Sequence, residues 1–373
     1  MTGRGIDQAL PHPGDPRIYE NHVVSAFEYV TIAEEANGPI SRPVGFSYIW
    51  GDSLAELSRA RPDARIINLE TSITRCEAPE PKQVNYKMSP ENVPCLAAAG
   101  IDCCVLANNH VLDWGSTGLN ETLETLSASK LRHVGAGRNL EDAAAPAIIE
   151  VAGKGRVIIF AFGSVTSGIP REWAATPEKA GVNLLADFSG RTAGEIATRT
   201  HAVRRVRDLI VGSIHWGGNW GYEIDQAARE FAHRLIDDAA VDVVHGHSSH
   251  HAKAIEVYRD KPILYGCGDF LNDYEGIGGY EVFRDDLALM YFVTFDMLTR
   301  KLVRLEMTPL QIRNFRLHRA SREDAQWLRD TLCRESAVFG AGVELADDNR
   351  LRLTWRCGAD ERWGSDAEMR KQP

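Results

Sequence analysis

The sequence has no long hydrophobic run and no excess of basic residues, and each absence excludes a class of protein. No window approaches the roughly 18 uninterrupted apolar residues of a membrane-spanning helix, so we predict no membrane span. The first residues, 1–5, lead into no apolar core of a signal peptide, and none is expected. The net charge of −10 argues against a nucleic-acid-binding protein.

Cysteines at metal-binding spacing are also missing. The seven cysteines are odd in number and contain no Cys-x-x-Cys pair, while Cys103 and Cys104 lie inside an apolar run. This pattern predicts reduced, mostly buried thiols and a cytoplasmic protein, without a disulfide framework or a zinc ribbon.

What is present is the composition of an ordinary globular protein, with 44% hydrophobic and 25% charged residues among 373. Strand-like and helical patterns alternate up to about residue 270, which predicts a layered α/β fold with its site where the strand ends converge. Residues 287–295 and 302–312 are expected to form an antiparallel pair. We predict a main domain over 1–318 and a C-terminal helical extension over 319–373, with a charged helix at 321–335.

Four polar clusters follow predicted strands, and six of the twelve histidines lie in them. The clusters are Asn68-Leu69-Glu70, Asn108-Asn109-His110 with Asp113, His215-Trp216-Gly217, and the run 245–251 with four histidines. Nitrogen and oxygen donors of this kind suit Zn, Mn, Fe or Ni, and the absence of nearby thiolates disfavours a structural zinc site.

Each cluster alone has an ordinary structural explanation. Glu70 fits a surface carboxylate or a helix cap, Asn-Asn-His fits a helix-capping turn, and His215 fits a core histidine. Four histidines within seven residues after a strand favour a metal or catalytic site, and the four clusters together strengthen that interpretation.

The glycine-rich loop 215–223 is the best candidate for a wall of the substrate site. Its aromatic residues Trp216, Trp220 and Tyr222 could close over a ligand, although packing residues would give the same pattern. Arg4 is a candidate contact for an anionic group, with a solvated charge as the alternative.

Together these motifs resemble the CapA family of bacterial capsule or poly-γ-glutamate synthesis proteins. The resemblance rests on Asn-Leu-Glu, Ala-Asn-Asn-His-x-x-Asp-x-Gly, His-Trp-Gly, Gly-His-x-x-His and the segment 265–270, in that order over about residues 1–275. The family is similar in turn to the calcineurin-like metallophosphoesterases. That similarity implies a two-layered β-sandwich flanked by helices, with one or two divalent metal ions (Mn, Fe or Zn).

The resemblance also implies roles for individual residues. His110 would protonate a leaving group, and Asp113 would fix the tautomer of His110 or cap a helix. The implied metal ligands are Glu70 as the bridging carboxylate, Asn109, His215 and His247 at the second metal, and His250 at the first.

Two positions depart from the family pattern. The family usually opens with a strand ending in Gly-Asp-x-Met-x-Gly-Arg, whereas this sequence begins Met1-Thr2-Gly3-Arg4. We therefore expect the first core strand and its aspartate to be missing, which leaves the first metal only Glu70 and His250. Asp269 stands where the family usually has asparagine.

Three functions remain open at this point. The first is a metal-dependent hydrolase or transferase acting on a phosphoester, or on an amide of an acidic polymer or peptide of γ-glutamyl type. The second is a metal-independent acid–base enzyme such as a peptide epimerase. The third is a non-catalytic partner in capsule assembly, since a fold alone does not define a reaction.

Overall fold

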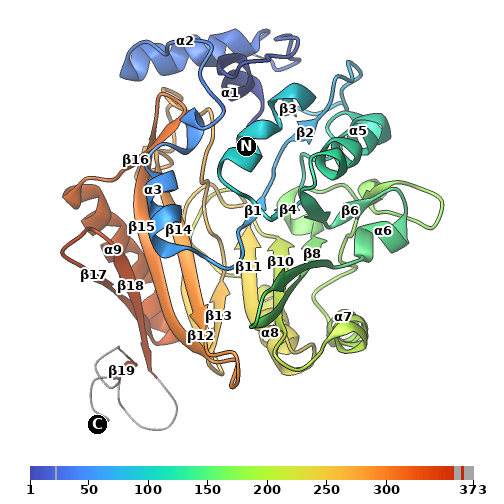
Figure 1. The fold of residues 1–373 in the computed structure, drawn as a ribbon, viewed down its shortest axis with the longest axis vertical. Helices are drawn as coiled ribbons and strands as arrows, with labels where there is room; N and C mark the ends of the chain where they lie inside the picture. Colours follow the sequence, from blue (N-terminus) through green and yellow to red (C-terminus); the bar gives the residue numbers. More distant parts are fainter. Residues whose placement is uncertain (22, 357–362, 365–373) are drawn as a thin grey trace.

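The computed structural model describes residues 1–21, 23–356 and 363–364, and it confirms a mixed α/β fold (Figure 1). One of its sheets has six strands, in the order β12-β13-β11-β10-β8-β7. The inner strands β8, β10, β11 and β13 are parallel, and β7 and β12 are antiparallel edge strands. The bounds are β7 (Ala147–Val151), β8 (Gly155–Gly163), β10 (Leu209–His215), β11 (Val243–His247), β12 (Ile255–Tyr258) and β13 (Lys261–Leu264).

Alternating side chains give this sheet two different faces. On one face Ile210 and Ile214 pack under α7 (Gly190–Val203) and α8 (Gln226–Asp237). On the other face Val211 and Val243 join the largest hydrophobic cluster, which lies between this sheet and the rest of the molecule. His215 and His247, which are in register, continue this second face to the end of the strands.

A second, three-stranded parallel sheet has the order β1-β4-β5. Cys103 and Cys104 on its central strand are fully buried and free, as the sequence predicts. The elements around it are β1 (Ile66–Asn68), β2 (Ser72–Ile73), β3 (Lys87–Met88), α4 (Pro94–Ala98), β4 (Cys103–Val105), α5 (Gly115–Ala128), β5 (Arg132–Val134), β6 (Ala136–Gly137), α6 (Leu140–Ala144) and β9 (Gly181–Val182).

A third, antiparallel sheet has the order β14-β15-β18-β17. The predicted pair 287–295 and 302–312 is confirmed as β14 (Leu287–Phe295) and β15 (Leu302–Arg313). The charged helix predicted at 321–335 is present as α9 (Arg322–Ser336), and the extension predicted as helical over 319–373 also contains strands. β17 (Ala341–Leu345) and β18 (Leu351–Arg356) follow α9, and β18 pairs with β15. Shorter strands also join this sheet, β16 (Arg316–Arg319) and β19 (Trp363–Gly364).

The N-terminal region lies above the sheets in Figure 1. Ser25 and Glu28 form a capping box that starts α2 (Ala26–Asn37). Before it, α1 (Arg4–Ala9) is buried along its length. A further helix, α3 (Ser53–Ala60), precedes β1.

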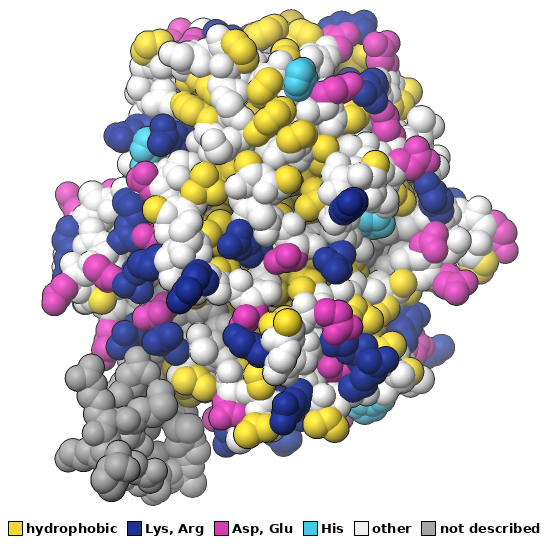
Figure 2. Space-filling model, viewed as in Figure 1, with side chains coloured by type: hydrophobic (Ala, Val, Ile, Leu, Met, Phe, Trp, Pro, Cys, Tyr) yellow, Lys and Arg dark blue, Asp and Glu magenta, His cyan; other side chains and the backbone are white. Residues whose placement is uncertain are grey.

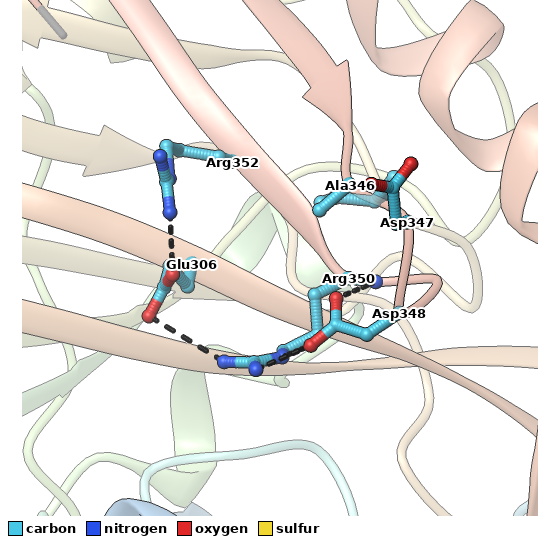
Figure 3. Close-up of a pocket in the computed structure, with 7 residues that line it drawn as sticks. Glu306, Ala346, Asp347, Asp348, Arg350 and Arg352 are labelled. Atoms are coloured by element: carbon cyan, nitrogen blue, oxygen red, sulfur yellow. Dashed lines mark hydrogen bonds and ion pairs between the residues drawn. The ribbon is translucent and has the colours of Figure 1, made fainter. Parts of the chain in front are cut away.

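Two hollows in the surface lie away from the predicted site residues. The first, of about 280 Å³, is lined by β15 and the β17–β18 turn, where arginines pair with Glu306 and Asp348 (Figure 3). The second, of about 380 Å³, lies at the β7–β8 turn. Neither contains a histidine, so neither replaces the strand ends as the candidate site.

Among the described residues, no helix has the length and apolar character to span a bilayer. Basic and acidic side chains alternate over the face seen in Figure 2, without a large field of one sign.

Candidate functional site

The candidate site forms where the ends of β1, β4, β10 and β11 meet. Glu70 follows β1, and Asn109 and His110 follow β4, while His215 and His247 are the last residues of β10 and β11. Parallel strands bring their carboxyl ends to one edge of a sheet. Here the edges of two sheets meet, one with β1 and β4 and the other with β10 and β11, so four distant segments contribute to one site. The structure therefore brings the four sequence clusters together.

Three donor atoms from three strand ends converge. The Asn109 Oδ1 atom lies 3.1 Å from His215 Nε2, and the Glu70 Oε1 atom lies 3.8 Å from the same nitrogen. The other oxygen of Glu70 accepts a hydrogen bond of 2.8 Å from Asn68, which in turn accepts one from Asn108. These two asparagines orient the carboxylate so that Oε1 faces His215.

His247 lies at Nδ1 of His215, whereas Asn109 and Glu70 lie at Nε2 of the same ring, and its role as a metal ligand stays a prediction. Its Nδ1 lies 2.7 Å from His215 Nδ1, and its Nε2 lies 3.0 Å from the Ser213 hydroxyl. The same hydroxyl lies 2.9 Å from Nδ1 of His245. His247 therefore supports the ring of His215 from behind in this structure.

Burial keeps these histidines neutral, which is the form that can donate an electron pair. Burial lowers the pKa of His215 to about 4, although nearby Glu70 acts in the opposite direction. It also lowers the pKa of His245 to about 4, and that of His247 well below its usual value.

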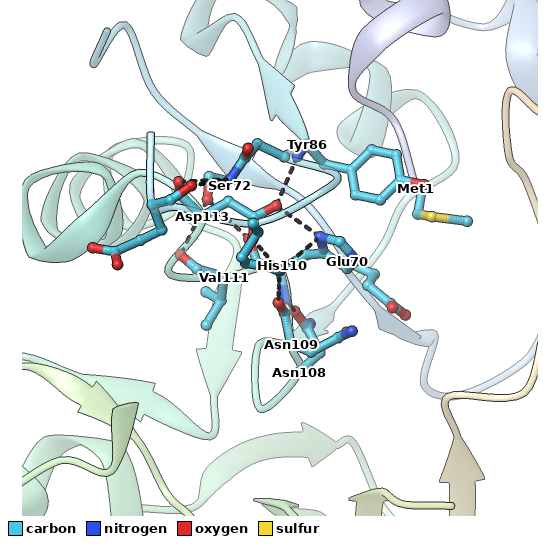
Figure 4. A network of polar contacts seen from close by, with 12 residues as sticks. Met1, Glu70, Ser72, Tyr86, Asn108, Asn109, His110, Val111 and Asp113 are labelled. Atoms are coloured by element: carbon cyan, nitrogen blue, oxygen red, sulfur yellow. Dashed lines mark hydrogen bonds and ion pairs between the residues drawn. The ribbon is translucent and has the colours of Figure 1, made fainter. Parts of the chain in front are cut away.

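His110 forms a hydrogen-bonded pair with Asp113. His110 Nδ1 lies 2.7 Å from the Asp113 carboxylate, which is fully buried and also accepts from the backbone amide of Tyr86 (Figure 4). Lys82 donates to the other oxygen of Asp113 at 2.5 Å and also to the carbonyl of Asn109. The proximity that the sequence suggested for His110 and Asp113 is therefore present, with a lysine added.

His250 forms a second pair of this kind, with Asp269. Its Nδ1 lies 3.0 Å from Asp269, which also accepts from Asn272 at 2.8 Å. Burial opposes the protonation of His250, but the charge of Asp269, the hydrogen bond to Asp269 and the charge of Glu70 together outweigh it and raise the pKa of His250. Tyr274 packs edge-on against the His250 ring, and its hydroxyl lies 2.6 Å from that of Tyr86.

Two of the predicted substrate contacts, Arg4 and Trp216, are buried in this structure. Arg4 is buried, and its guanidinium already pairs with Asp273 at 2.6 Å and Glu20 at 2.9 Å, so it has no exposed face for an anion. Trp216 is 5% exposed and donates to the carbonyl of Tyr265, in the core beneath the sheet. Both residues stabilise the fold around the site.

Trp220 and Tyr222 lie at the edge of the site. The Trp220 ring is 5.2 Å from the His250 ring, and Tyr222 packs edge-on against His251 at 4.6 Å. Both side chains are partly exposed. The prediction that they contact substrate stays open on this geometry.

Sequence reasoning missed Lys82 and Ser213, and it assigned no role to Asn68. Lys82 lies in a proline-rich loop without periodic pattern, and only its packing against the Asn109–Asp113 turn reveals a role. Asn68 was visible as part of the Asn-Leu-Glu motif. Ser213 lies two residues before His215, so the alternation of strand side chains could have placed it on the same face.

The chain is similar to capsule synthesis proteins over most of its length. The family model described as "Bacterial capsule synthesis protein PGA_cap" matches residues 1–274. A Mycobacterium tuberculosis protein named "Probable polyglutamine synthesis accessory protein" is 46% identical over 355 residues, which cover 95% of this chain and 93% of that protein. The "PGA biosynthesis protein CapA" of Bacillus subtilis is 28% identical over 62% of this chain and 56% of its own length. The "Capsule biosynthesis protein CapA" of Bacillus anthracis is 28% identical, over 52% and 45%.

Proposed function

This chain belongs to the bacterial capsule synthesis protein family, and we propose that it is a metal-dependent hydrolase or transferase in the synthesis of a polyglutamate- or polyglutamine-type polymer. The bond acted on would be an amide or a phosphoester. The observation that carries the proposal is the convergence of Glu70, Asn109 and His215 beside the His110–Asp113 pair.

The donor set fits a divalent ion such as Mn, Fe or Zn. Ligand bonds of about 2.0–2.2 Å put neighbouring donors roughly 3–3.5 Å apart, close to the 3.1 and 3.8 Å measured around His215 Nε2. Among the described residues, no group of three His, Cys, Asp or Glu side chains is arranged to hold an ion, so the amide oxygen of Asn109 is needed. Such an ion would supply Lewis acidity and a nucleophile at neutral pH.

The chain itself would supply the proton transfer. The Asp113 carboxylate accepts from Nδ1–H of His110, which leaves Nε2 of the ring to exchange a proton with the reacting group. A histidine suits this task because its unperturbed pKa of about 6.5 lies near the working pH. Lys82 fixes the turn that carries both residues.

The metallophosphoesterase-like architecture is part of the same proposal. It is supported by two parallel sheets whose strand ends share one site, and by helices on the outer face of the larger sheet. A second ion at His250 would have fewer donors than the first, since only Glu70 and His250 of the implied ligands belong to it. Asp269, which lies at Nδ1 of His250, would orient this ring and leave its Nε2 for the ion.

Metal analysis of the full chain tests the proposal. After saturation with Mn, Fe or Zn and removal of excess ion, we expect bound metal in the wild type and most of it lost in His215→Ala. His233→Ala is the matched control, because His233 also pairs with a buried carboxylate, Glu256, at 3.0 Å. Equal metal in the wild type and His215→Ala would refute the ligand assignment. A wild type that binds no metal after this saturation, and that turns over neither a phosphodiester nor a γ-glutamyl peptide, would refute the function.

A further inference from the structure

An aromatic surface adjoins the site on the side of His250. We call it the aromatic rim and define it by Trp220, Tyr222, Tyr280 and Phe283. Trp220 and Tyr280 stack in parallel, with ring centroids 3.9 Å apart and planes 5° apart. Phe283 packs against Trp220 at 5.4 Å and against Tyr222 at 5.6 Å, which makes the four rings continuous.

Two glycine-containing loops carry the rim. Gly217, Gly218 and Gly221 surround Trp220, and Gly276, Gly278 and Gly279 precede Tyr280. Tyr280 remains 40% exposed although it stacks on Trp220. Since Trp220 also packs on His250, the exposed rings continue the surface outward from the candidate site.

The charges around the rim are mostly negative. Asp285 follows Phe283 by two residues, and burial together with neighbouring Asp286, Asp269 and Glu281 raises its pKa. Glu223 and Glu281 are exposed next to rim residues.

The basic residues near the rim already have partners. Arg284 pairs with Asp286 and Asp324, and Arg334, which lies over Tyr222, pairs with Glu335 at 2.8 Å. Lys253 donates to the carbonyl of Glu223. From the described residues, a chain with one carboxylate per residue would therefore meet mostly repulsion at the rim.

We propose that the aromatic rim binds a neutral, amide-bearing polymer segment of the polyglutamine type, in preference to an acidic polyglutamate. This inference rests on the proposed function and names the substrate class for the same site. The flat, rigid faces of Trp and Tyr offer contact area to planar amides at little entropic cost. It replaces the acidic polymer that the sequence resemblance suggested.

Binding of short oligopeptides to the full chain tests this preference. We would measure the affinity for fluorescein-labelled hexaglutamine and for hexaglutamate of the same linkage, at about 50 and 200 mM salt. We expect hexaglutamine to bind at least about tenfold more tightly, with little salt dependence. Tyr280→Ala and Trp220→Ala should each weaken its binding about tenfold or more.

A matched control is Tyr258→Ala, because Tyr258 stacks on His233 at 3.8 Å and 5° outside the rim. This variant should bind hexaglutamine like the wild type. A charge variant, Glu281→Lys, should improve hexaglutamate binding in a salt-dependent manner and leave hexaglutamine binding nearly unchanged.

Tighter, steeply salt-dependent binding of hexaglutamate to the wild type would overturn the inference and leave the proposed metal-dependent function intact. If a neutral oligosaccharide bound more tightly than hexaglutamine, and if Tyr280→Ala removed this binding, the rim would be assigned to a glycan. That result would also overturn the inference. No binding of either peptide would overturn it as well. The metal content of the same samples reports separately on the proposed function.

Discussion

Two histidine–aspartate pairs lie in the site, and their carboxylates have different surroundings. Asp113 is shared by His110, the Lys82 ammonium and the amide of Tyr86. Asp269 is shared by His250 and the neutral amide of Asn272. The pairs have similar geometry, with nitrogen–oxygen distances of 2.7 and 3.0 Å.

The difference shows that the neighbours of such a pair determine its effect. Lys82 balances the charge of Asp113, which leaves that carboxylate mainly the task of orienting His110. The charge of Asp269 acts on His250 and raises its pKa in spite of burial. Asp113 thus mainly orients His110, whereas Asp269 favours the protonated form of His250.

The largest effect is expected from His110→Ala. Loss of a general acid should reduce turnover roughly 10²–10⁴-fold, while bound metal and folding stay nearly unchanged because His110 is outside the proposed ligand set. Turnover of a phosphodiester and of a γ-glutamyl peptide by metal-loaded protein is the measurement. His201→Ala on the exposed side of α7 is the control. Wild-type turnover in His110→Ala would remove this residue from the mechanism.

Asp113→Asn should have a smaller effect on the same assay. The amide oxygen can still accept from Nδ1–H of His110, so orientation is weakened and not abolished. We expect turnover to fall roughly 10–100-fold, as is typical when a supporting residue is changed. A loss equal to that of His110→Ala would mean that the charge of Asp113, and not only its position, is required.

Lys82→Met tests the balancing charge through stability. The fully buried Asp113 would lose its basic partner, and we expect the free energy of unfolding to fall by about 1–3 kcal/mol in chemical denaturation. Lys154→Met provides the comparison, since Lys154 pairs with Asp63 on the surface, where both side chains are about half exposed. That variant should stay within about 0.5 kcal/mol of the wild type. Equal losses in both would show that Lys82 is not needed to balance Asp113.

Asp269→Asn should have the smallest effect. Asparagine keeps an oxygen that accepts from His250, and it is the usual residue at this position in the family that the motifs resemble. We expect a change in unfolding free energy below about 1 kcal/mol, as for exchange of one hydrogen-bond acceptor for another. A destabilisation as large as that of Lys82→Met would show that the two pairs depend equally on their carboxylate charge.

The sequence predicted the parts of the fold that follow periodic patterns. Strands β14 and β15 lie close to their predicted ranges because alternation and apolar runs mark them. The tail was misjudged because β17 and β18 are short, and their hairpin joins the sheet only through the pairing of β18 with β15, which is a long-range contact.

Candidate site residues were predictable where a motif follows a strand. Glu70 and Asn109 lie together because the parallel strands β1 and β4 end at the same edge of one sheet. His215 ends a strand of another sheet, and the packing of the two sheets brings it to them. The two tryptophans of one loop show the limit of this reasoning, since Trp216 is buried and Trp220 lies on the rim. Their order in the sequence carries no sign of that difference. It depends on Tyr265, 49 residues after Trp216, and on Tyr280, 60 residues after Trp220.

The pairing of β18 with β15 has a consequence for how the protein tolerates cleavage. A protease cut between β16 and α9 that released the C-terminal segment would free part of one edge of β15. It would also uncover Leu305 and Met307, which pack with Leu328 and Leu332 of α9. Exposed strand edges with apolar side chains are templates for intermolecular pairing. Damage to the end of the chain would therefore lead to self-association.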